Sequence, residues 1–407
     1  MHHRIVLTHP TGNTFVRAAA RALHARGWLH GFYTTVVAPD GAAARLLPAA
    51  ARRQLARRKF TDIPRDLVHA HPWCEAARLG SAKLGAPALV SVDTVYRDLD
   101  DHVARELASM AGVTGVYAYE DGAEQSFRAA RNRGMECVYE LPIAHWETTQ
   151  RLLREEAERL PAWRDTLTGL NDSAVKLERK ARELELADTV IVPSAFVFDS
   201  LPAQIRRSKR CVVAPFGAPR VADDAPARPR GERLRVLFAG AMTQRKGLAD
   251  LFAAMTLLGR ADVELVVMGS PVAPMPFYRQ QYADFVYEAP RPHAEVLALM
   301  QTCDVLVLPA IVEGRALVQL EALANGLPLI VTRNAGGEDL VEEGRTGFVV
   351  PVRAPEALAA RLAWFADHKP MLADMRADAR RKATEFPWAN YETAICDAVS
   401  AAEAARC

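Results

Sequence analysis

Residues 304–332 read DVLVLPAIVEGRALVQLEALANGLPLIVT. This stretch contains a short apolar run, a loop with Glu313 and Gly314, a helical pattern and a second apolar run. Gly326 and Pro328 follow the helical pattern directly, and these residue types are ordinary helix-stop signals. The order strand, helix, strand predicts two parallel strands that are connected by a helix packed on the sheet.

The same alternation of apolar runs and helical patterns extends over the chain in two series. Expected strands lie at residues 4–8, 115–119, 136–140 and 187–193, and then at 234–239, 263–268, around 286, 304–308, 329–332 and 347–350. Residues 222–232 (ADDAPARPRGE) separate the two series, and their charge and proline content is typical of a linker. Because 407 residues also exceed the usual size of one core, about 250–300 residues, we expect two α/β domains.

Composition excludes several protein classes. Half of the residues are hydrophobic and 25% are charged, which is ordinary for a globular chain and excludes a disordered, collagen-like or coiled-coil protein. The 51 basic and 49 acidic residues give a net charge of +2, so no nucleic-acid partner is expected. No apolar run approaches the roughly 20 residues of a membrane-spanning helix, and no leader pattern opens the sequence. Six cysteines without a C-x-x-C pair favour a reduced, cytoplasmic protein.

A candidate anion site follows the expected strand at 234–239. Gly240 ends the run VLFAG, and Arg245-Lys246-Gly247 then opens a helix. A glycine turn and two cations at a helix N-terminus suit a diphosphate, because the backbone amides, the helix dipole and the side chains all favour negative charge. The alternative interpretation is a solvated helix cap.

Two glutamates form a second candidate pair. Glu313 and Glu321 are eight residues apart, which on a helix places them within roughly 80° of one face. Glu321 is flanked by apolar residues, and a charged group in such a stripe needs polar partners, for which sugar hydroxyls are suitable. The alternative is that both are surface glutamates.

Together these segments resemble family 4 of the retaining, nucleotide-sugar-dependent glycosyltransferases. The matching blocks cover most of residues 235–365 and are Gly240 with Arg245-Lys246-Gly247, the Glu313/Glu321 pair, the run 321–332 and the loop Ala335-Gly336-Gly337-Glu338. The resemblance implies a GT-B fold, in which two Rossmann-like α/β domains face each other across a cleft. It suggests an acceptor-binding domain at 1–213, a linker at 214–232, a nucleotide-sugar-binding domain at 233–385 and a helix at 386–407 that crosses back to the first domain.

The resemblance also implies residue roles and a retaining, hexosyltransferase-type reaction. Arg245 and Lys246 would hold the donor diphosphate, Glu321 the ribose and Glu313 the transferred sugar. Gly240 and the backbone amides of Arg315, Ala316, Leu317 and Val318 would complete the donor site. The acceptor hydroxyl would attack from the face that the diphosphate leaves, and a phosphate oxygen would take its proton, so no metal or other cofactor is implied. The family commonly has an aromatic residue and glycine at Arg315-Ala316 and often an arginine at Ala241; Arg315 therefore either contacts the donor or points to solvent.

Polar residues in the first half are candidates for the acceptor site. The loop Thr11-Gly12-Asn13 follows the first strand, Glu120 and Asp121 follow the strand at 115–119, and Glu140 and His145 follow the next strand. Carboxyl ends of parallel strands line the crevice of such folds, so acceptor ligands or acid/base groups are expected there. The segments HPTGN and YEDGA also resemble a subgroup of bacterial glycosyltransferases. The alternatives are a plain glycine turn, helix caps, and a His145 that packs on Trp146.

The predicted partners are a UDP- or GDP-linked sugar and a saccharide or lipid-linked acceptor of the bacterial envelope. The segment 45–59 carries six basic residues and no acidic one, which suggests peripheral contact with anionic lipid at the inner face of the membrane, or else a solvated helix face. Asp98-Leu99-Asp100 and His69-Ala70-His71 imitate metal motifs, but the first lies in a helical pattern and the second lacks a third ligand. Two other functions fit the same site: a GT-B-fold sugar-nucleotide epimerase and a non-catalytic sugar-nucleotide-binding protein.

Overall fold

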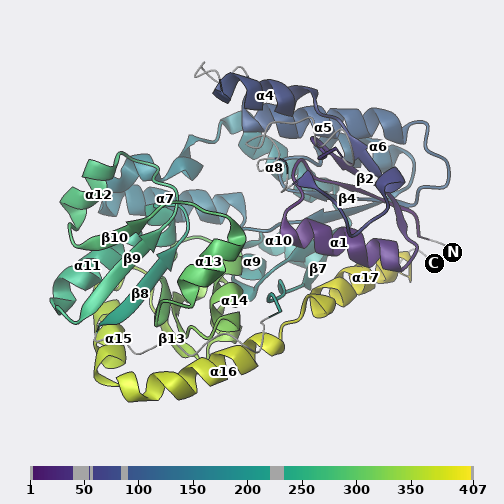
Figure 1. The fold of residues 1–407 in the computed structure, drawn as a ribbon. Coiled ribbons are helices and arrows are strands. Elements are labelled where there is room, and N and C mark those ends of the chain that lie inside the picture. The colour runs from purple at the N-terminus through teal and green to yellow at the C-terminus, as the bar shows by residue number, and fades with distance from the viewer. Residues whose placement is uncertain (1–2, 40–54, 56–57, 84–89, 221–232, 405–407) are drawn as a thin grey trace.

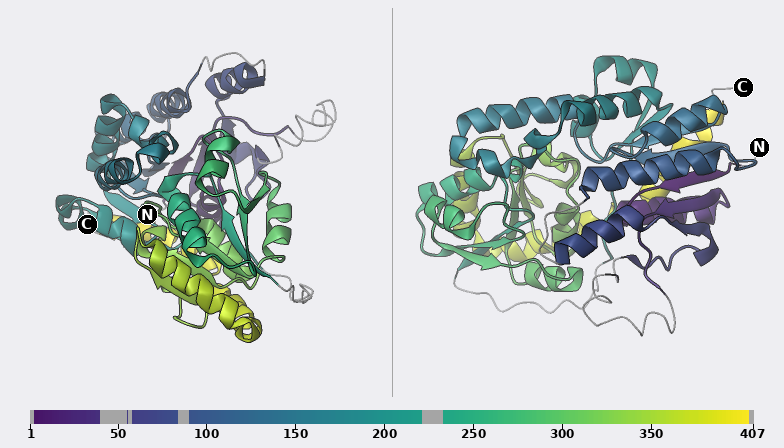
Figure 2. Two further views of the ribbon diagram at one scale, coloured as in Figure 1. Left: turned by 90° about the vertical axis from the view of Figure 1, so that its left-hand side faces the viewer. Right: turned by 90° about the horizontal axis from the view of Figure 1, so that it is seen from above.

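The computed structural model describes residues 3–39, 55, 58–83, 90–220 and 233–404. Within them the chain forms two α/β domains, each built on a parallel sheet with helices on its faces (Figure 1). The predicted fold class, two Rossmann-like domains, is therefore confirmed. Figure 2 shows from above that the two domains occupy opposite ends of the molecule.

Among the described residues, the first sheet has seven parallel strands in the order β3-β2-β1-β4-β5-β6-β7. Its strands are β1 (Ile5–Thr8), β2 (Leu29–Thr34), β3 (Val68–Ala70), β4 (Gly115–Tyr119), β5 (Glu136–Glu140), β6 (Thr189–Val192) and β7 (Arg210–Val213). The helices of this half are α1 (Thr14–Ala25), α4 (Trp73–Lys83), α5 (Val92–Leu107), α6 (Glu124–Asn132), α7 (Trp146–Arg159), α8 (Ala174–Leu186), α9 (Ala195–Ser200) and α10 (Ala203–Ser208).

The second sheet has six parallel strands in the order β10-β9-β8-β11-β12-β13. Its strands are β8 (Leu234–Ala239), β9 (Val263–Met268), β10 (Phe285–Glu288), β11 (Val305–Leu308), β12 (Leu329–Thr332) and β13 (Gly347–Val350). Its helices are α11 (Leu248–Leu258), α12 (Met275–Gln281), α13 (His293–Met300), α14 (Leu317–Ala324), α15 (Pro355–Asp367) and α16 (Leu372–Thr384). The quoted stretch 304–332 forms β11, α14 and β12, and its strands are fully buried because helices cover both faces of the sheet.

The chain crosses between the domains more than once. After α16 it returns to the first domain, where α17 (Trp388–Ala404) lies along α1 (Figure 1). An ion pair between Arg21 and Glu392 and a hydrogen bond from Cys396 Sγ to the carbonyl of Ala22 (3.7 Å) connect these two helices. The proposed linker falls largely on residues 221–232, which lie outside the described residues.

One segment of the first half packs on the second domain. The α7–η3 segment, residues 146–166, consists of α7 and the short 3-10 helix η3 (Pro161–Thr166). Trp163 of this segment is buried against the rings of Phe252, Phe277 and Tyr278, all of which belong to the second domain. In Figure 1, α7 accordingly appears on the side of the second domain, and η3 contacts η5 (Gln244–Lys246) of that domain. The predicted domain boundary at residue 213 therefore does not separate the packing of the two domains completely, because residues 146–166 pack on the second domain.

Candidate functional site

Three of the predicted donor residues meet where β8 and β11 end. Arg245 and Lys246 belong to η5 (Gln244–Lys246), a short 3-10 helix after β8, and Glu313 lies in the loop after β11. Lys246 Nζ forms an ion pair with Glu313 Oε1, and Arg245 Nη1 lies 2.9 Å from the same oxygen. Because the two strands are adjacent and parallel, their carboxyl ends bring these distant residues into one cluster.

The cluster keeps Glu313 ionised although it is nearly buried. Burial alone would raise the pKa of this carboxyl group, yet Lys246 and Arg245 beside it lower its pKa to about 2. Two positive charges surround a single carboxylate, so the cluster as a whole carries an excess positive charge. This positive charge would attract an anionic group that approaches the carboxyl edge of the sheet.

Two glycines allow this loop to pack closely. Gly240 has a φ of 146°, and a Cβ at that position would lie 2.9 Å from Lys246 Cδ. Gly247 has a φ of 79°, and its Cβ would lie 2.0 Å from the carbonyl oxygen of Pro309. A side chain at Gly240 would therefore displace the side chain of Lys246, and one at Gly247 would displace the backbone beside Pro309.

Glu321 lies on α14, and Glu313 lies in the loop before that helix. The Glu321 carboxylate is mostly buried and has His293 Nε2 at 2.9 Å from its Oε1. His293 begins α13 and was not among the predicted site residues, because nothing in its local sequence distinguishes it from a surface histidine. At the N-terminus of α14, Ala316 is the capping residue and Leu317 and Val318 form the first turn.

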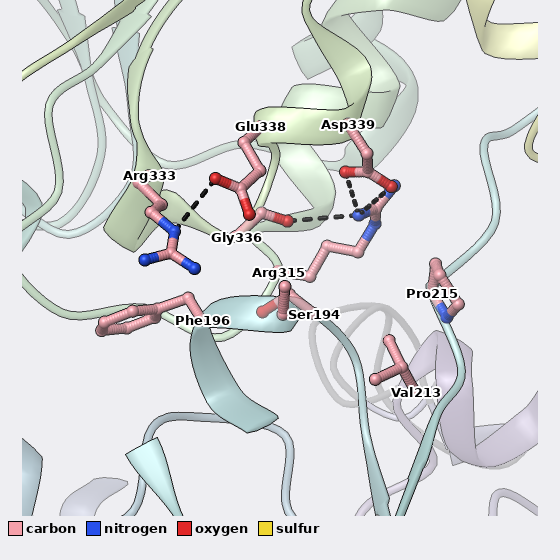
Figure 3. A pocket seen from close by; sticks show the side chains of 10 residues that line it. Ser194, Phe196, Val213, Pro215, Arg315, Arg333, Gly336, Glu338 and Asp339 are labelled. Atoms are coloured by element: carbon pink, nitrogen blue, oxygen red, sulfur yellow. Dashed lines mark hydrogen bonds and ion pairs between the residues drawn. The ribbon is translucent and has the colours of Figure 1, made fainter. Parts of the chain in front are cut away.

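The side chain of Arg315 points neither to the Glu313 cluster nor to solvent. It is buried and its Nη1 donates to both carboxylate oxygens of Asp339, at 2.7 and 3.0 Å, and to the carbonyl of Gly336 at 3.2 Å (Figure 3). The solvent-facing alternative is therefore excluded. Arg315 lines a pocket of about 140 Å³ between the domains, together with Ser194, Ala195, Phe196, Val213, Pro215, Arg333, Gly336, Glu338 and Asp339.

The first domain touches the loop after β11 directly at Gly314. Ile143 pairs with Gly314 as an isolated antiparallel bridge, and Ser194 Oγ donates to the Gly314 carbonyl at 2.7 Å. A Cβ on Gly314 would lie 1.7 Å from the carbonyl oxygen of Pro142, so only glycine permits this approach. The segment after β5 therefore lies against the residue that follows Glu313.

Glu120 and Asp121 belong to an ionic cluster with α8. Lys180 Nζ lies 3.5 Å from Glu120, and Arg179 and Lys176 lie 3.4 and 3.5 Å from Asp121. Burial raises the pKa of Glu120 to about 7, against the opposing effect of Lys180. A carboxyl group that titrates near neutrality is suited to proton transfer. A buried carboxylate paired with a lysine is, however, equally typical of a purely structural ion pair.

His145 is the residue before α7 and is buried. Burial, with a smaller contribution from the charge of Lys180, lowers its pKa to about 4, so its ring is neutral at pH 7. The ring centroid lies 5.6 Å from that of Trp146, and Nδ1 has no hydrogen-bond partner among the described residues. His145 therefore packs beside Trp146 two residues beyond the contact with Gly314.

Glu140 requires a correction. It was expected to be an acceptor ligand or acid/base group, but its carboxylate is buried inside the first domain and accepts hydrogen bonds from Tyr117 (2.6 Å) and Tyr391 (2.9 Å). Burial raises the pKa of Glu140 to about 7, although these hydroxyl groups oppose the shift. Because Tyr391 belongs to α17, the returning helix covers this carboxylate.

The loop Thr11-Gly12-Asn13 precedes α1. Thr11 Oγ1 donates to Asn13 Oδ1 at 3.1 Å, and Asn13 is the residue before α1 but does not cap it with its side chain. A Cβ on Gly12 would lie 2.1 Å from the ring of Phe60, so this glycine allows a close packing contact.

Most of the basic segment 45–59 lies outside the described residues. Of its cations, Arg58 and Lys59 are described. Arg58 is partly buried, with its Nη2 at 2.7 Å from Glu75 Oε1. The two motifs that resemble metal sites, residues 98–100 and 69–71, have side chains that bind other groups of the protein. Asp100 accepts the backbone N–H groups of Gln125 and Ser126, and His71 pairs with Asp98 at 3.0 Å. Among the described residues, no helix is both long and apolar enough to span a membrane, and no three metal-ligating side chains are gathered.

Residues 222–382 match the family described as glycosyl transferases group 1. The resemblance that the sequence suggested is thus confirmed at this level for the second domain. The chain is 31% identical over 167 residues to D-inositol 3-phosphate glycosyltransferase from Corynebacterium glutamicum, a match that covers 38% of this chain and 40% of that protein. The chain therefore matches less than half the length of this curated relative.

Two solved structures have a similar fold over nearly the whole chain. Sucrose-phosphate synthase from Thermosynechococcus elongatus superimposes with a TM-score of 0.67 at 17% identity, over 99% of this chain and all of the other. Anabaena Alr3699/HepE in complex with UDP gives a TM-score of 0.62 at 16% identity, over 98% and 100% of the two chains. At this identity the likeness concerns the fold alone, and it agrees with the predicted GT-B architecture of two Rossmann-like domains.

Proposed function

We propose that this protein is a retaining glycosyltransferase that moves a hexosyl group from a nucleotide diphosphate donor to a hydroxyl group of an acceptor. The observation that supports it best is the convergence of Arg245 and Lys246 on Glu313 at the carboxyl edge of the second sheet. The match of residues 222–382 to the group 1 glycosyl transferases supports the same reaction class.

In this proposal the donor diphosphate binds between the two cations and the N-terminus of α14. As the bond from the sugar to the diphosphate breaks, negative charge grows on the leaving phosphate, and Arg245, Lys246 and the amides of Leu317 and Val318 stabilise it. The acceptor hydroxyl forms the new bond on the face that the diphosphate leaves, and a leaving-phosphate oxygen takes its proton. Glu313 orients the sugar hydroxyls, and the scheme includes no metal ion.

The donor is proposed to carry UDP or GDP, with UDP tested first, because a structural neighbour was solved in complex with UDP. Glu321 with His293 is the candidate for the ribose hydroxyls, since a mostly buried carboxylate beside a histidine offers both an acceptor and a donor. The acceptor is proposed to be a saccharide or lipid-linked saccharide of the bacterial envelope. It would be reached from the cytoplasmic side, with peripheral membrane contact through residues 45–59.

The test is thermal unfolding of the wild-type protein and Lys246→Ala against UDP-, GDP-, ADP- and TDP-sugars. A ligand at 100 times its Kd adds about 2.7 kcal/mol to the unfolding free energy, which gives a measurable shift. We expect one nucleotide to stabilise the wild type and to lose its effect in Lys246→Ala. Conversion of a nucleotide sugar without any acceptor would instead identify an epimerase. Binding without transfer to any acceptor tested would leave a non-catalytic binding protein.

A further inference from the structure

Gln244 directly precedes the two candidate diphosphate cations and is completely buried. Its side-chain amide is fully paired: Nε2 donates to Glu156 Oε2 at 2.9 Å and to Asp250 Oδ2 at 2.7 Å, while Oε1 accepts the backbone N–H of Ala249 at 2.8 Å. Ionised carboxylates only accept hydrogen bonds, so these partners leave the amide a single orientation. Both polar atoms of the Gln244 side chain therefore form hydrogen bonds that fix the first residue of η5.

Some of these partners come from the first half of the chain. Glu156 lies on α7, and the backbone N–H of Gln244 donates to Thr166 Oγ1 in η3 at 3.1 Å. Glu156 and Thr166 are themselves fully buried. Two hydrogen bonds thus connect the α7–η3 segment to the residue before Arg245.

Charge pairing keeps the segment in place. Arg159 Nη2 lies 2.8 Å from both Glu156 and Asp250, and Arg353 forms a further ion pair with Glu156. The two buried carboxylates are therefore neutralised, as buried charges require. Trp163 adds apolar contact, and its Nε1 donates to Gln281 at 3.2 Å.

The same short helix is also tied to the Glu313 loop. The backbone carbonyl of Arg245 accepts the N–H groups of Ile311 (2.9 Å) and Val312 (3.2 Å), and Arg245 Nη1 donates to the Val312 carbonyl at 2.9 Å. A displacement of Gln244 would consequently move Arg245 and Lys246 relative to Glu313. Hydrogen bonds from α7 and η3 on one side and from the β11 loop on the other fix their positions.

We propose that the α7–η3 segment is a positioning element for the donor site, with Gln244 and Thr166 as positioning residues that orient Arg245 and Lys246. Donor affinity then depends on residues of the first half that touch no donor atom. This inference rests on the proposed function, because it assumes that the two cations bind the diphosphate.

The experiment compares the affinity of UDP for Thr166→Val, Thr166→Ser and Gln281→Leu with that of the wild type, by calorimetry at a temperature where circular dichroism shows every variant folded. Thr166→Val is nearly isosteric and removes the hydroxyl acceptor, whereas Thr166→Ser keeps it. Gln281→Leu is the matched control, because it removes another hydrogen bond between the same segment and the same domain, away from η5. We expect the Kd of UDP to rise at least tenfold in Thr166→Val and to stay within twofold of wild type in the other two.

Equal affinity in all folded proteins, or an equal loss in Gln281→Leu, would overturn the positioning role. Thr166→Ala serves in place of Thr166→Val if the latter does not fold. Backbone hydrogen exchange of residues 245–249, measured without nucleotide, separates this inference from the proposed function. If the wild type binds neither UDP nor GDP, the donor assignment fails. In that case the positioning role of the α7–η3 segment is still supported if the amides of residues 245–249 exchange faster in Thr166→Val than in Thr166→Ser. Equal exchange rates in the two variants would overturn it.

Discussion

Glu313→Gln tests whether the two cations hold a carboxylate of unusually low pKa. The pKa of Glu313 is lowered from its ordinary value of 4.5 to about 2. At about 1.36 kcal/mol per pKa unit, this difference corresponds to about 3.4 kcal/mol of unfolding free energy. Because the folded-state pKa is lowered, this stability is fully present above pH 4.5 and is lost as the pH falls toward 2. We therefore expect Glu313→Gln to be about 3 kcal/mol less stable than wild type at pH 7 and about 2 kcal/mol less stable at pH 3.5.

Urea unfolding at both pH values measures this difference, with Glu338→Gln as the control. Glu338 also pairs with an arginine of the second domain, Arg333, but both side chains are more than a third exposed, so its loss should cost less than about 1 kcal/mol. UDP binding by Glu313→Gln should not weaken, because the variant keeps both cations and removes the negative charge between them. A Glu313→Gln protein as stable as wild type at pH 7, or equally destabilised at both pH values, would refute the electrostatic reasoning.

Three further predictions concern separate parts of the molecule. Glu321→Ala should weaken UDP binding about tenfold, whereas Glu313→Ala should mainly lower turnover; calorimetry and a transfer assay separate the two effects. Gly247→Ala should destabilise the protein by at least 2 kcal/mol in urea unfolding, because its φ is 79° and its Cβ would meet the carbonyl of Pro309 at 2.0 Å. Glu140 has a folded pKa raised to about 7, so wild-type stability should fall as the pH rises from 4.5 through 7. Glu140→Gln should show a smaller decline than wild type, with Glu120 still contributing because its pKa is also raised to about 7, and equal declines in both proteins would contradict the prediction.

The fold of the second domain could be predicted well because its strands are strongly apolar and buried, and because glycines and prolines end its helices. In the first domain, β2, β3 and β7 were not predicted. β3 has only three residues, too few to show a period, and β7 is an edge strand whose side chains are partly exposed. Such strands depend on pairing with neighbours that are distant in sequence.

In the candidate site, too, residues whose position follows from local sequence could be predicted, whereas residues whose partners are distant in sequence could not. Arg245, Lys246 and Glu313 could be identified because each follows a predicted strand, and parallel topology then brings strand ends together. Glu140 also follows a strand, but its partners include Tyr391, which is 251 residues away on α17. Which polar groups surround a strand end is decided by tertiary packing, so sequence spacing alone cannot distinguish a ligand-binding carboxylate from a buried structural one.

The contacts of η5 and of the loop after β11 with the first half bear on how the domains can move. Gly314 in the loop after β11 is held by Ile143 and Ser194. Gln244 in η5 is held by Glu156 and Thr166, so the first half contacts both segments that carry the predicted donor residues. The contacts of Gln244 are buried and charge-paired, whereas those of Gly314 involve backbone atoms and one hydroxyl group. Separating the α7–η3 segment from the second domain would take Gln244 and Arg353 away from the buried Glu156. It would also take Arg159 away from the buried Asp250, so this separation is far more costly than breaking the contacts of Gly314. Any opening between the domains should therefore separate Ile143 from Gly314 first and carry the α7–η3 segment along with the second domain, so that the geometry of Arg245 and Lys246 survives the movement.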